Sequence, residues 1–443
     1  TPSVVEFRGG GTVEVGSEAR KKLFISSSNS LGRFKREMGK STTYEVSGQS
    51  HTPTDLSAFV LKKLVQDTEK VVGNIDGVVV SIPANFSNEA RDATITAASS
   101  AGLEVEFIVN EPTAAALYYA YKSGNALSGT YAVYDLGGGT FDISIIHVED
   151  QDIEVLGANG IAKCGGDDFD RTLHSLIREK YKASTGEDLD EVDFTVNDAE
   201  EEKKSLSKRE KIVVRVLREN IEVTRSEFEE VISSLISQAR LATESTVDEV
   251  GIPVAELTGV FLVGGSTRIP AVQQSVRSIF GKDPISTANV DEVVALGAAV
   301  YAAYKGDRSK LNVIQRKSIE KIKVDERTAM CFGTIAMDSE TNEKYNSVII
   351  QKNHKIPCSV TESYYTAHDG QVSVNLRVTE SRSPERDPTF VKILKEGNLN
   401  LPSGREAGQE IKVTFSFDEN QVMHCKFVDV ASGREQVFGI SAA

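Results

Sequence analysis

The sequence predicts an α/β domain at residues 1–305, a linker at 306–323 and an all-β domain at 324–443. In the first part, short β-branched apolar runs alternate with helical patterns, which is typical of helices packed on a sheet. After the linker, apolar residues recur at every second position, as in strands that bury one face. The segment between them is polar and rich in lysine and arginine. A chain of 443 residues is also long for one core, so we expect more than one domain.

The elements of the first domain follow from apolar runs bounded by glycine, proline or capping residues. Residues 1–7 have the composition of a strand. Ser87 is a suitable helix N-cap because the acidic Glu89 follows in the first turn, and Gly102 is a suitable end for that helix. We therefore expect strands at residues 77–83, 103–109, 131–136, 141–148 and 256–263, and helices at 87–101 and 111–121.

The second domain shows alternation with period two over residues 347–350, 372–378 and 411–417. Asp369-Gly370 is a hairpin-type turn dipeptide, and Glu419-Asn420 is a weaker turn candidate. These patterns predict a compact antiparallel β domain.

Charge and composition exclude several classes of function. The net charge of −15 argues against nucleic acid or an anionic membrane surface as the main partner. No apolar run approaches the about 20 residues needed to span a bilayer, and no signal peptide opens the chain. The four cysteines have no CxxC spacing and the six histidines are dispersed, so we expect neither disulfides nor a zinc site. A reducing, cytoplasmic compartment fits these observations.

The strongest chemical motif is Asp135-Leu136-Gly137-Gly138-Gly139-Thr140-Phe141-Asp142, which follows a predicted strand. Three consecutive glycines allow a tight turn whose N–H groups face outward and cradle phosphate oxygens. Thr140 adds a hydroxyl beside the phosphates. Asp135 and Asp142 suit Mg²⁺ that keeps several of its waters. The alternative is a glycine hairpin with incidental acidic residues.

A second glycine turn, Gly264-Gly265-Ser266-Thr267-Arg268-Ile269-Pro270, also follows a strand and precedes a helix. It can hold phosphate or, through Arg268, stack on a base, although such turns often need glycine for packing alone. Gly165-Gly166 is a weaker candidate of the same kind. Together the turns suggest a nucleotide held between two halves.

These motifs resemble the Hsp70 chaperone family, within the fold group that also contains actin and sugar kinases. The resemblance rests on residues 110–116 (NEPTAAA), 135–142, 264–270 and 295–299 (ALGAA), which stand in the family's order. It implies a two-lobed, actin-like ATPase domain with ribonuclease H-like sheets, followed by a β-sandwich. ATP or ADP and Mg²⁺ are the implied cofactors, and a divergent, DnaK-like member of bacterial type is the nearest description.

The resemblance also implies roles for individual residues. Lys35 matches the lysine that positions the attacking water, although by itself it reads as an exposed lysine on a short helix. Further matches at the nucleotide, including phosphate, Mg²⁺-water and nucleoside contacts, are Glu111, Asp135, Thr140, Asp142, Glu200, Lys203, Lys204, Ser207, Arg268 and Asp291. Pro83 and Arg91 match a pair that signals between domains. The implied peptide-binding residues, which otherwise read as β-domain core, are Met337, Tyr364, Ala367, Val374 and Leu376.

The implied function is an ATP-dependent chaperone that binds extended hydrophobic segments of unfolded polypeptides, with a J-domain co-chaperone and a nucleotide exchange factor as partners. Two alternatives stay open: a degenerate Hsp70-like protein that binds without hydrolysis, and a small-molecule kinase of the same fold group. The β domain argues against a kinase, and the presence of Lys35, Glu111 and Asp135 argues against loss of hydrolysis.

Several features depart from the family pattern. The first phosphate-binding strand and loop, and the helical segment that covers the peptide site, are not in the sequence. The linker is basic, and its nearest equivalent to the usual acidic, leucine-rich segment is at residues 322–325. Phe107 stands where many members carry a basic residue used in J-domain coupling, and Lys163-Cys164 replaces the usual His-Leu before Gly165. These changes bear on stimulation by a J-domain protein and on communication between domains.

Overall fold

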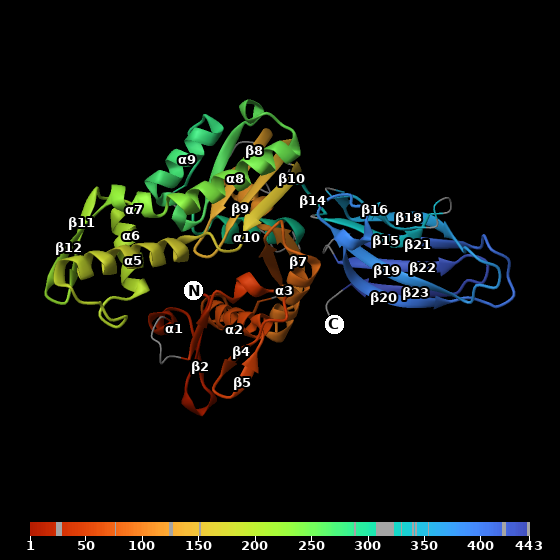
Figure 1. The fold of residues 1–443 in the computed structure, drawn as a ribbon, viewed down its shortest axis with the longest axis horizontal. Coiled ribbons are helices and arrows are strands. Elements are labelled where there is room, and N and C mark those ends of the chain that lie inside the picture. Colours follow the sequence, from red (N-terminus) through yellow and green to blue (C-terminus); the bar gives the residue numbers. More distant parts are fainter. Residues whose placement is uncertain are drawn as a thin grey trace.

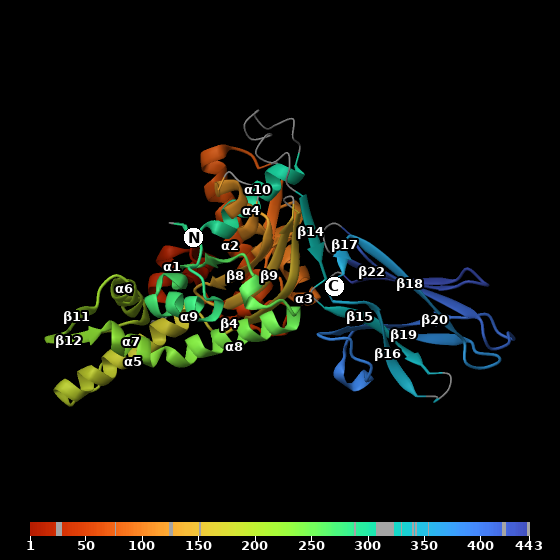
Figure 2. The ribbon, with the colours of Figure 1, turned by 90° about the horizontal axis from the view of Figure 1, so that it is seen from above.

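The structure is a computed structural model that describes residues 1–23, 29–75, 77–123, 127–149, 152–287, 289–306, 323–328, 330–338, 341, 343–352, 354–418 and 422–440. Residues 307–322 of the expected linker lie outside the described residues, as does the turn predicted at Glu419-Asn420. An α/β region spans residues 1–306, and the strands of an all-β region lie to one side of it (Figures 1 and 2). None of the helices in the described ranges has the length and apolar character required to cross a membrane.

The α/β region alternates strands and helices, as its sequence pattern predicts. Its helices are α1 (Ser17–Lys22), α2 (Pro53–Val72), α3 (Asn88–Ser100), α4 (Glu111–Ser123), α5 (Gly166–Thr185), α6 (Val196–Leu206), α7 (Arg225–Val231), α8 (Ser233–Val250), α9 (Pro270–Phe280) and α10 (Val293–Lys305), with short 3₁₀ helices η2 (Phe34–Glu37) and η4 (Gly265–Arg268). Its strands are β1 (Val4–Phe7), β2 (Val13–Val15), β3 (Ser30–Gly32), β4 (Tyr44–Val46), β5 (Gln49–His51), β6 (Val78–Ile82), β7 (Val105–Asn110), β8 (Gly129–Leu136), β9 (Phe141–Glu149), β10 (Asp152–Ile161), β11 (Lys211–Val216), β12 (Glu219–Thr224), β13 (Gly259–Val263) and β14 (Lys323–Arg327).

A central sheet has the strand order β13-β8-β9-β10-β14-β17, where β17 is Lys355–Ile356. Strand β8 is buried on both faces, which explains its continuous apolar run. Ala132, Tyr134 and Leu136 pack into one apolar cluster with residues of α5, α6 and α9, and Tyr131 and Val133 pack into another with residues of α4 and α10. Because helices cover both faces, the carboxyl end of β8 is held firmly where the glycine loop begins.

Local sequence signals account for several element boundaries. Ser87 caps α3, and its side chain accepts a hydrogen bond from the N–H of Ala90, so the predicted helix start is confirmed. The antiparallel β8–β9 hairpin is also confirmed. The strand predicted at residues 256–263 begins only at Gly259, because residues 254–256 form a 3₁₀ turn.

The all-β region is a sandwich of antiparallel sheets. Its strands are β15 (Cys331–Met337), β16 (Lys344–Ile350), β17 (Lys355–Ile356), β18 (Cys358–Tyr365), β19 (Ser373–Ser381), β20 (Lys392–Asn400), β21 (Glu410–Phe417), β22 (Met423–Asp429) and β23 (Glu435–Ile440). One sheet has the order β16-β15-β19-β20 and the other β18-β21-β22-β23. Alternate residues of β21, from Ile411 to Phe417, enter a shared apolar core, as the period-two pattern predicts.

Strand β14 connects the two regions. It pairs in parallel with β10, with Ile153 opposite Val324, and in antiparallel fashion with β17. The expected domain boundary at residue 324 therefore falls inside a strand that extends the central sheet. The predicted turn at Asp369-Gly370 is present, with Gly370 at φ +68°, but it joins β18 and β19, which belong to different sheets.

Candidate functional site

Three carboxylates and a lysine converge at the end of the central sheet. Asp135 on β8 lies directly opposite Asp142 on β9 in the antiparallel register. Glu111 is the first residue of α4, immediately after β7. Lys35 on η2 brings its Nζ within 2.8 Å of Glu111 Oε1. Residues more than 100 positions apart in the sequence thus form one charged cluster.

The charges in this cluster do not balance. Burial, together with the charges of Glu111 and Asp142, raises the pKa of Asp135 well above its ordinary value. Burial and the charge of Glu111 likewise raise the pKa of Asp142 to about 6. Desolvation in the cleft opposes the charged form of Lys35, but the neighbouring carboxylates, Glu111 first, raise its pKa overall. One lysine faces three acids, so the site has an excess of negative charge that a cation would relieve.

The glycine loop at residues 137–140 is held by its carbonyl groups. Gly137 O accepts hydrogen bonds from Gly166 N (2.9 Å) and Ser266 Oγ (2.9 Å), and Gly138 O accepts one from Asp167 N (2.8 Å). The described residues provide no acceptor for the N–H groups of Gly138 and Gly139. These bonds to the carbonyl groups hold the loop in place and leave the N–H groups of Gly138 and Gly139 as candidate donors to a ligand.

All three glycine turns meet at this loop. A Cβ on Gly165 would lie 2.7 Å from Gly138 O, and a Cβ on Gly264, whose φ is +84°, would lie 2.4 Å from Leu136 O. Only glycine permits such close backbone approach at these two positions. The turns at Gly165 and Gly264 therefore pack against the glycine loop at residues 137–140, in addition to any direct contact with a ligand.

A cleft of about 470 Å³ opens above the loop and adjoins a second cavity of about 690 Å³. The first contains Lys35, Glu111, Asp135 and the glycine loop; the second contains α6 and Arg268. Asp167, Glu200 and Asp291 are among the residues common to both. The cleft with the glycine loop has several apolar residues in its wall, whereas charged and polar side chains dominate the wall of the second cavity.

The residues at the sheet end suit a Mg²⁺–phosphate group. Backbone N–H donors match phosphate oxygens, and hard carboxylate oxygens match Mg²⁺ or its waters. Within the described ranges, no three His, Cys, Asp or Glu side chains come close enough to hold a metal ion directly. Asp135 and Asp142 therefore fit a Mg²⁺ that is held chiefly through water and through the phosphates of a nucleotide.

The Hsp70 family model, described as Hsp70 protein, matches residues 41–443. The chain belongs to the Hsp70 family. The Hsp70 match runs from residue 41 in the α/β region to the end of the β-sandwich, so these two regions are one family unit and not a fusion of unrelated domains; Lys35 and Arg36 precede the matched residues.

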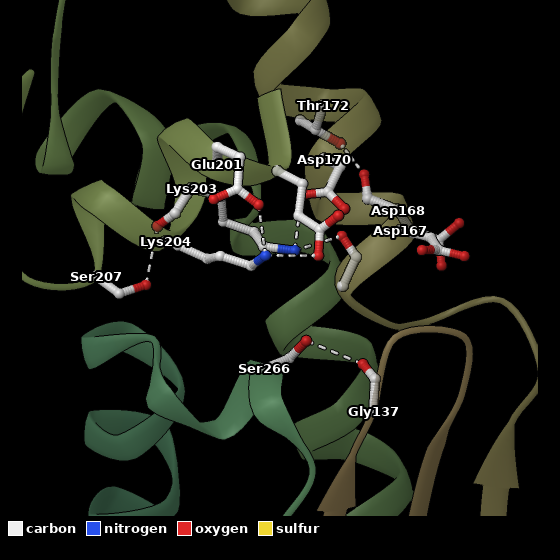
Figure 3. Close-up of polar contacts among 12 residues, drawn as sticks. Gly137, Asp167, Asp168, Asp170, Thr172, Glu201, Lys203, Lys204, Ser207 and Ser266 are labelled. Atoms are coloured by element: carbon white, nitrogen blue, oxygen red, sulfur yellow. Dashed lines mark hydrogen bonds and ion pairs between the residues drawn. The ribbon is translucent and has the colours of Figure 1, made fainter. Parts of the chain in front are cut away.

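The residues that the resemblance assigns to the nucleoside line the larger cavity of this Hsp70 chain. Figure 3 shows Lys203 and Lys204 of α6 and Ser207 at its end among them. Lys203 is buried, where its Nζ lies 2.7 Å from Asp170 Oδ1 and donates to Gly166 O at 3.0 Å. Burial raises the pKa of Asp170 to about 6, although Lys203 opposes this shift. Lys203 thus ties α6 to the start of α5.

The other expected nucleoside residues lie closer to solvent. Lys204 pairs with Glu200 and Glu201 on its own helix, and Ser207 Oγ donates to Lys203 O. Arg268 Nη2 lies 3.0 Å from Asp291 Oδ2 across the cavity, with about half of each side chain exposed. This exposed pair leaves both side chains accessible to a ligand from the cavity.

Three arginines that the sequence did not indicate as functional form ion pairs across the cleft. Arg33 Nε lies 2.5 Å from Asp167 Oδ2, and Arg36 Nη2 lies 2.9 Å from Asp168 Oδ2. Arg20 pairs with Glu200 on α6 in the same way. In each case the arginine comes from residues 20–36 and its acid from α5 or α6. The only sequence signal was a basic residue beside Lys35, which does not identify a partner more than 130 positions away.

The expected peptide-binding residues are divided between core and surface. Leu376 is buried, and Tyr364 and Val374 pack against the same sandwich core. Met337, at the end of β15, and Ala367 are exposed. The β15–β19 pairing stops at Thr334 opposite Val378, so the last residues of β15 extend beyond the ladder. Three of the five residues thus belong to the sandwich core, and two lie on its surface.

Of the two expected interdomain residues, Arg91 lies where the two regions touch. Pro83 adjoins the carboxylate cluster, and Arg91 on α3 faces Glu380 of β19 in a small cavity. Nearby, Lys392 Nζ on β20 lies 2.5 Å from Glu89 Oε1 on α3. Phe107, where the resemblance leads one to expect a basic residue, packs edge-to-face on Tyr301.

Proposed function

We propose that this Hsp70 protein is an ATP-dependent chaperone that binds extended apolar segments of unfolded polypeptides and adjusts its affinity through ATP binding and hydrolysis. The observation that carries the proposal is the meeting of Lys35, Glu111, Asp135 and Asp142 beside the donor-bearing glycine loop. This set of groups matches a Mg²⁺–triphosphate, which needs both acidic groups for the cation and donors for the phosphates.

The proposed reaction uses positioning and electrostatics in place of covalent catalysis. Lys35 and Glu111 would orient the attacking water. The N–H groups of Gly138 and Gly139, with the hydroxyl of Thr140, would stabilise charge on the transferred phosphoryl group. Bound Mg²⁺ would supply further charge neutralisation, with Asp135 and Asp142 holding its waters.

We also propose the two-lobed, actin-like arrangement that the resemblance implies. The ion pairs from Arg20, Arg33 and Arg36 support it, because they join the N-terminal elements to α5 and α6 on the other side of the cleft. Opening and closing of these lobes would admit and retain the nucleotide. Glu200, Lys203, Lys204, Ser207, Arg268 and Asp291 would enclose the nucleoside.

The β-sandwich is proposed as the peptide site, with Met337, Tyr364, Ala367, Val374 and Leu376 around it. The last residues of β15 pair with β16 but not with β19, and this supports the role, because a strand edge without a partner can hydrogen-bond to an extended peptide without regard to its sequence. Met337 adds an adaptable apolar contact.

Communication between the sites is proposed to pass through α3 and β14. Both elements connect the two regions: α3 through Glu89 and Lys392, and β14 through its pairing with β10. Pro83 and Arg91 would transmit the nucleotide state. A J-domain protein and an exchange factor are the proposed partners in a cytoplasmic compartment, and J-domain coupling would have to use residues other than Phe107.

Calorimetric titration with MgATP and MgADP, combined with phosphate release and fluorescent-peptide binding, tests the proposal. We expect binding of both nucleotides, slow hydrolysis without any added phosphate acceptor, and binding of an apolar peptide. Nucleotide binding without hydrolysis would favour the non-hydrolysing module. Hydrolysis only with a small-molecule acceptor would favour a kinase, and absence of nucleotide binding would contradict the proposal.

A further inference from the structure

Arg36 and Lys35 are adjacent in sequence but serve opposite sides of the glycine loop. Lys35 reaches Glu111 in the carboxylate cluster, while Arg36 reaches Asp168 in the first turn of α5. Both side chains line the same cleft. The Lys35 side chain is half exposed, whereas only 9% of the Arg36 side-chain surface is exposed.

The guanidinium of Arg36 makes only some of the hydrogen bonds that it can donate. Its Nη2 donates to Asp168, but its buried Nε has no hydrogen-bond partner in the part of the chain that the structure describes. This Nε lies 3.5 Å from the position that a Cβ would occupy on Gly139. An arginine N–H that is buried and unpaired is costly, and in native sites it commonly points to a ligand.

Protein acceptors close to Arg36 are already engaged. Asp167 accepts from Arg33, and the carbonyls of Gly137 and Gly138 accept from the turns behind the loop. None of these groups hydrogen-bonds to Nε, so an acceptor that enters from the cleft would satisfy it. There it would meet the N–H groups of Gly138 and Gly139, a combination that favours a phosphate oxygen.

We propose that Arg36 binds the terminal phosphate of ATP through Nε and thereby favours the triphosphate over the diphosphate. This inference rests on the proposed function and deepens it. Lys35 and the cation would lie on one flank of the terminal phosphate, and Arg36 on the other. Its bond to Asp168 fixes the guanidinium plane, so that the free edge stays directed at the loop.

Titration of the full chain with MgADP and with the Mg²⁺ complex of the β,γ-imido analogue of ATP tests this role. In R36K and R36Q, we expect affinity for the triphosphate analogue to fall about tenfold or more, since a charged hydrogen bond is lost, with a smaller change for MgADP. Lys is the conservative variant, and thermal unfolding of both variants checks that they fold.

Two matched variants separate phosphate contact from closure of the cleft. R33Q removes the neighbouring cross-cleft ion pair and should weaken binding of the two nucleotides by similar factors. D168N releases the guanidinium of Arg36, so it should weaken binding of the triphosphate analogue more than binding of MgADP, as R36Q does. Equal losses of affinity for the two nucleotides in R36K, matching those in R33Q, would mean that Arg36 only joins the two sides of the cleft; this result would overturn the inference and leave the proposed function standing. If the wild type binds neither nucleotide, the proposed function and the inference both fail.

Discussion

Lys35 Nζ donates a hydrogen bond of 2.8 Å to Glu111 Oε1, which joins η2 to the first residue of α4. Through this contact, the only lysine of the carboxylate cluster within the described residues is held beside Asp135 and Asp142. In the proposed mechanism, this bond holds the Lys35 ammonium group close to both the transferred phosphoryl group and the attacking water.

Replacing Lys35 with alanine should therefore separate binding from turnover. In K35A, MgATP binding should remain largely intact, because the glycine loop and the nucleoside residues are unchanged. Single-turnover hydrolysis should fall about 100-fold or more, because the water loses its positioning group. The alternative result, unchanged hydrolysis, would remove Lys35 from the mechanism.

Asp142 should strengthen ATP binding through its interaction with bound Mg²⁺. In D142N, the Mg²⁺-dependent part of ATP affinity should fall about tenfold or more, since an outer ligand to the metal's waters loses its charge. Calorimetry with Mg²⁺ and with EDTA makes the comparison. The same loss under both conditions would mean that Asp142 supports the fold and not the metal.

Gly264 should be intolerant of any side chain. In G264A, the new Cβ would lie 2.4 Å from Leu136 O, on a backbone with φ +84°. We therefore expect the free energy of unfolding to fall by about 3 kcal/mol or more. Gly186 is a matched control with φ +79° and no atom within 4 Å of a Cβ, so G186A should cost only about 1 kcal/mol. Urea unfolding measures both; equal losses would mean that the turn has room to shift.

The contact between α3 and β19 should depend on pH through Glu380. Burial, with the charge of Glu89, raises the pKa of Glu380 from 4.5 to about 7, while Lys392 and Arg91 oppose the shift and Asn88 donates its backbone N–H. Because the folded form holds the proton more tightly than the unfolded form, this group lowers stability as pH rises from about 4.5 to about 7.

The variant E380Q keeps the shape of the protonated acid and removes its titration. Relative to wild type, it should be more stable at pH 8 than at pH 5 by about 1 to 3 kcal/mol in urea unfolding. Subtracting the unfolding free energy of wild type from that of E380Q at each pH cancels the contributions of Asp142 and Asp170, which also have raised pKa values. Parallel pH dependences for the two proteins would exclude Glu380 as the titrating group.

Features that depend on a few neighbouring residues could be predicted from the sequence. The Ser87 cap, the glycine loop after β8 and the alternation in β21 each follow from local chemistry: a hydroxyl acceptor, a permissive backbone and a buried face. The family was also predicted, and the match to the Hsp70 family model confirms it.

Features that depend on tertiary pairing could not be predicted. The turn at Asp369-Gly370 was found, but local chemistry does not say that its two strands join different sheets. Likewise, β14 reads as the start of the β domain, and only its pairing with β10 shows that it extends the central sheet. The cross-cleft partners of Arg33 and Arg36 depend on how α5 is placed, which no short segment specifies.

Release of a prebound fluorescent apolar peptide on addition of MgATP tests the central claim most directly. Two sites that communicate through α3 and β14 predict faster release with MgATP than with MgADP, and no acceleration in the absence of Mg²⁺. Tight peptide binding with a release rate that ignores ATP would contradict nucleotide control of peptide affinity, and a wild type that binds no peptide would contradict the assignment of the β-sandwich.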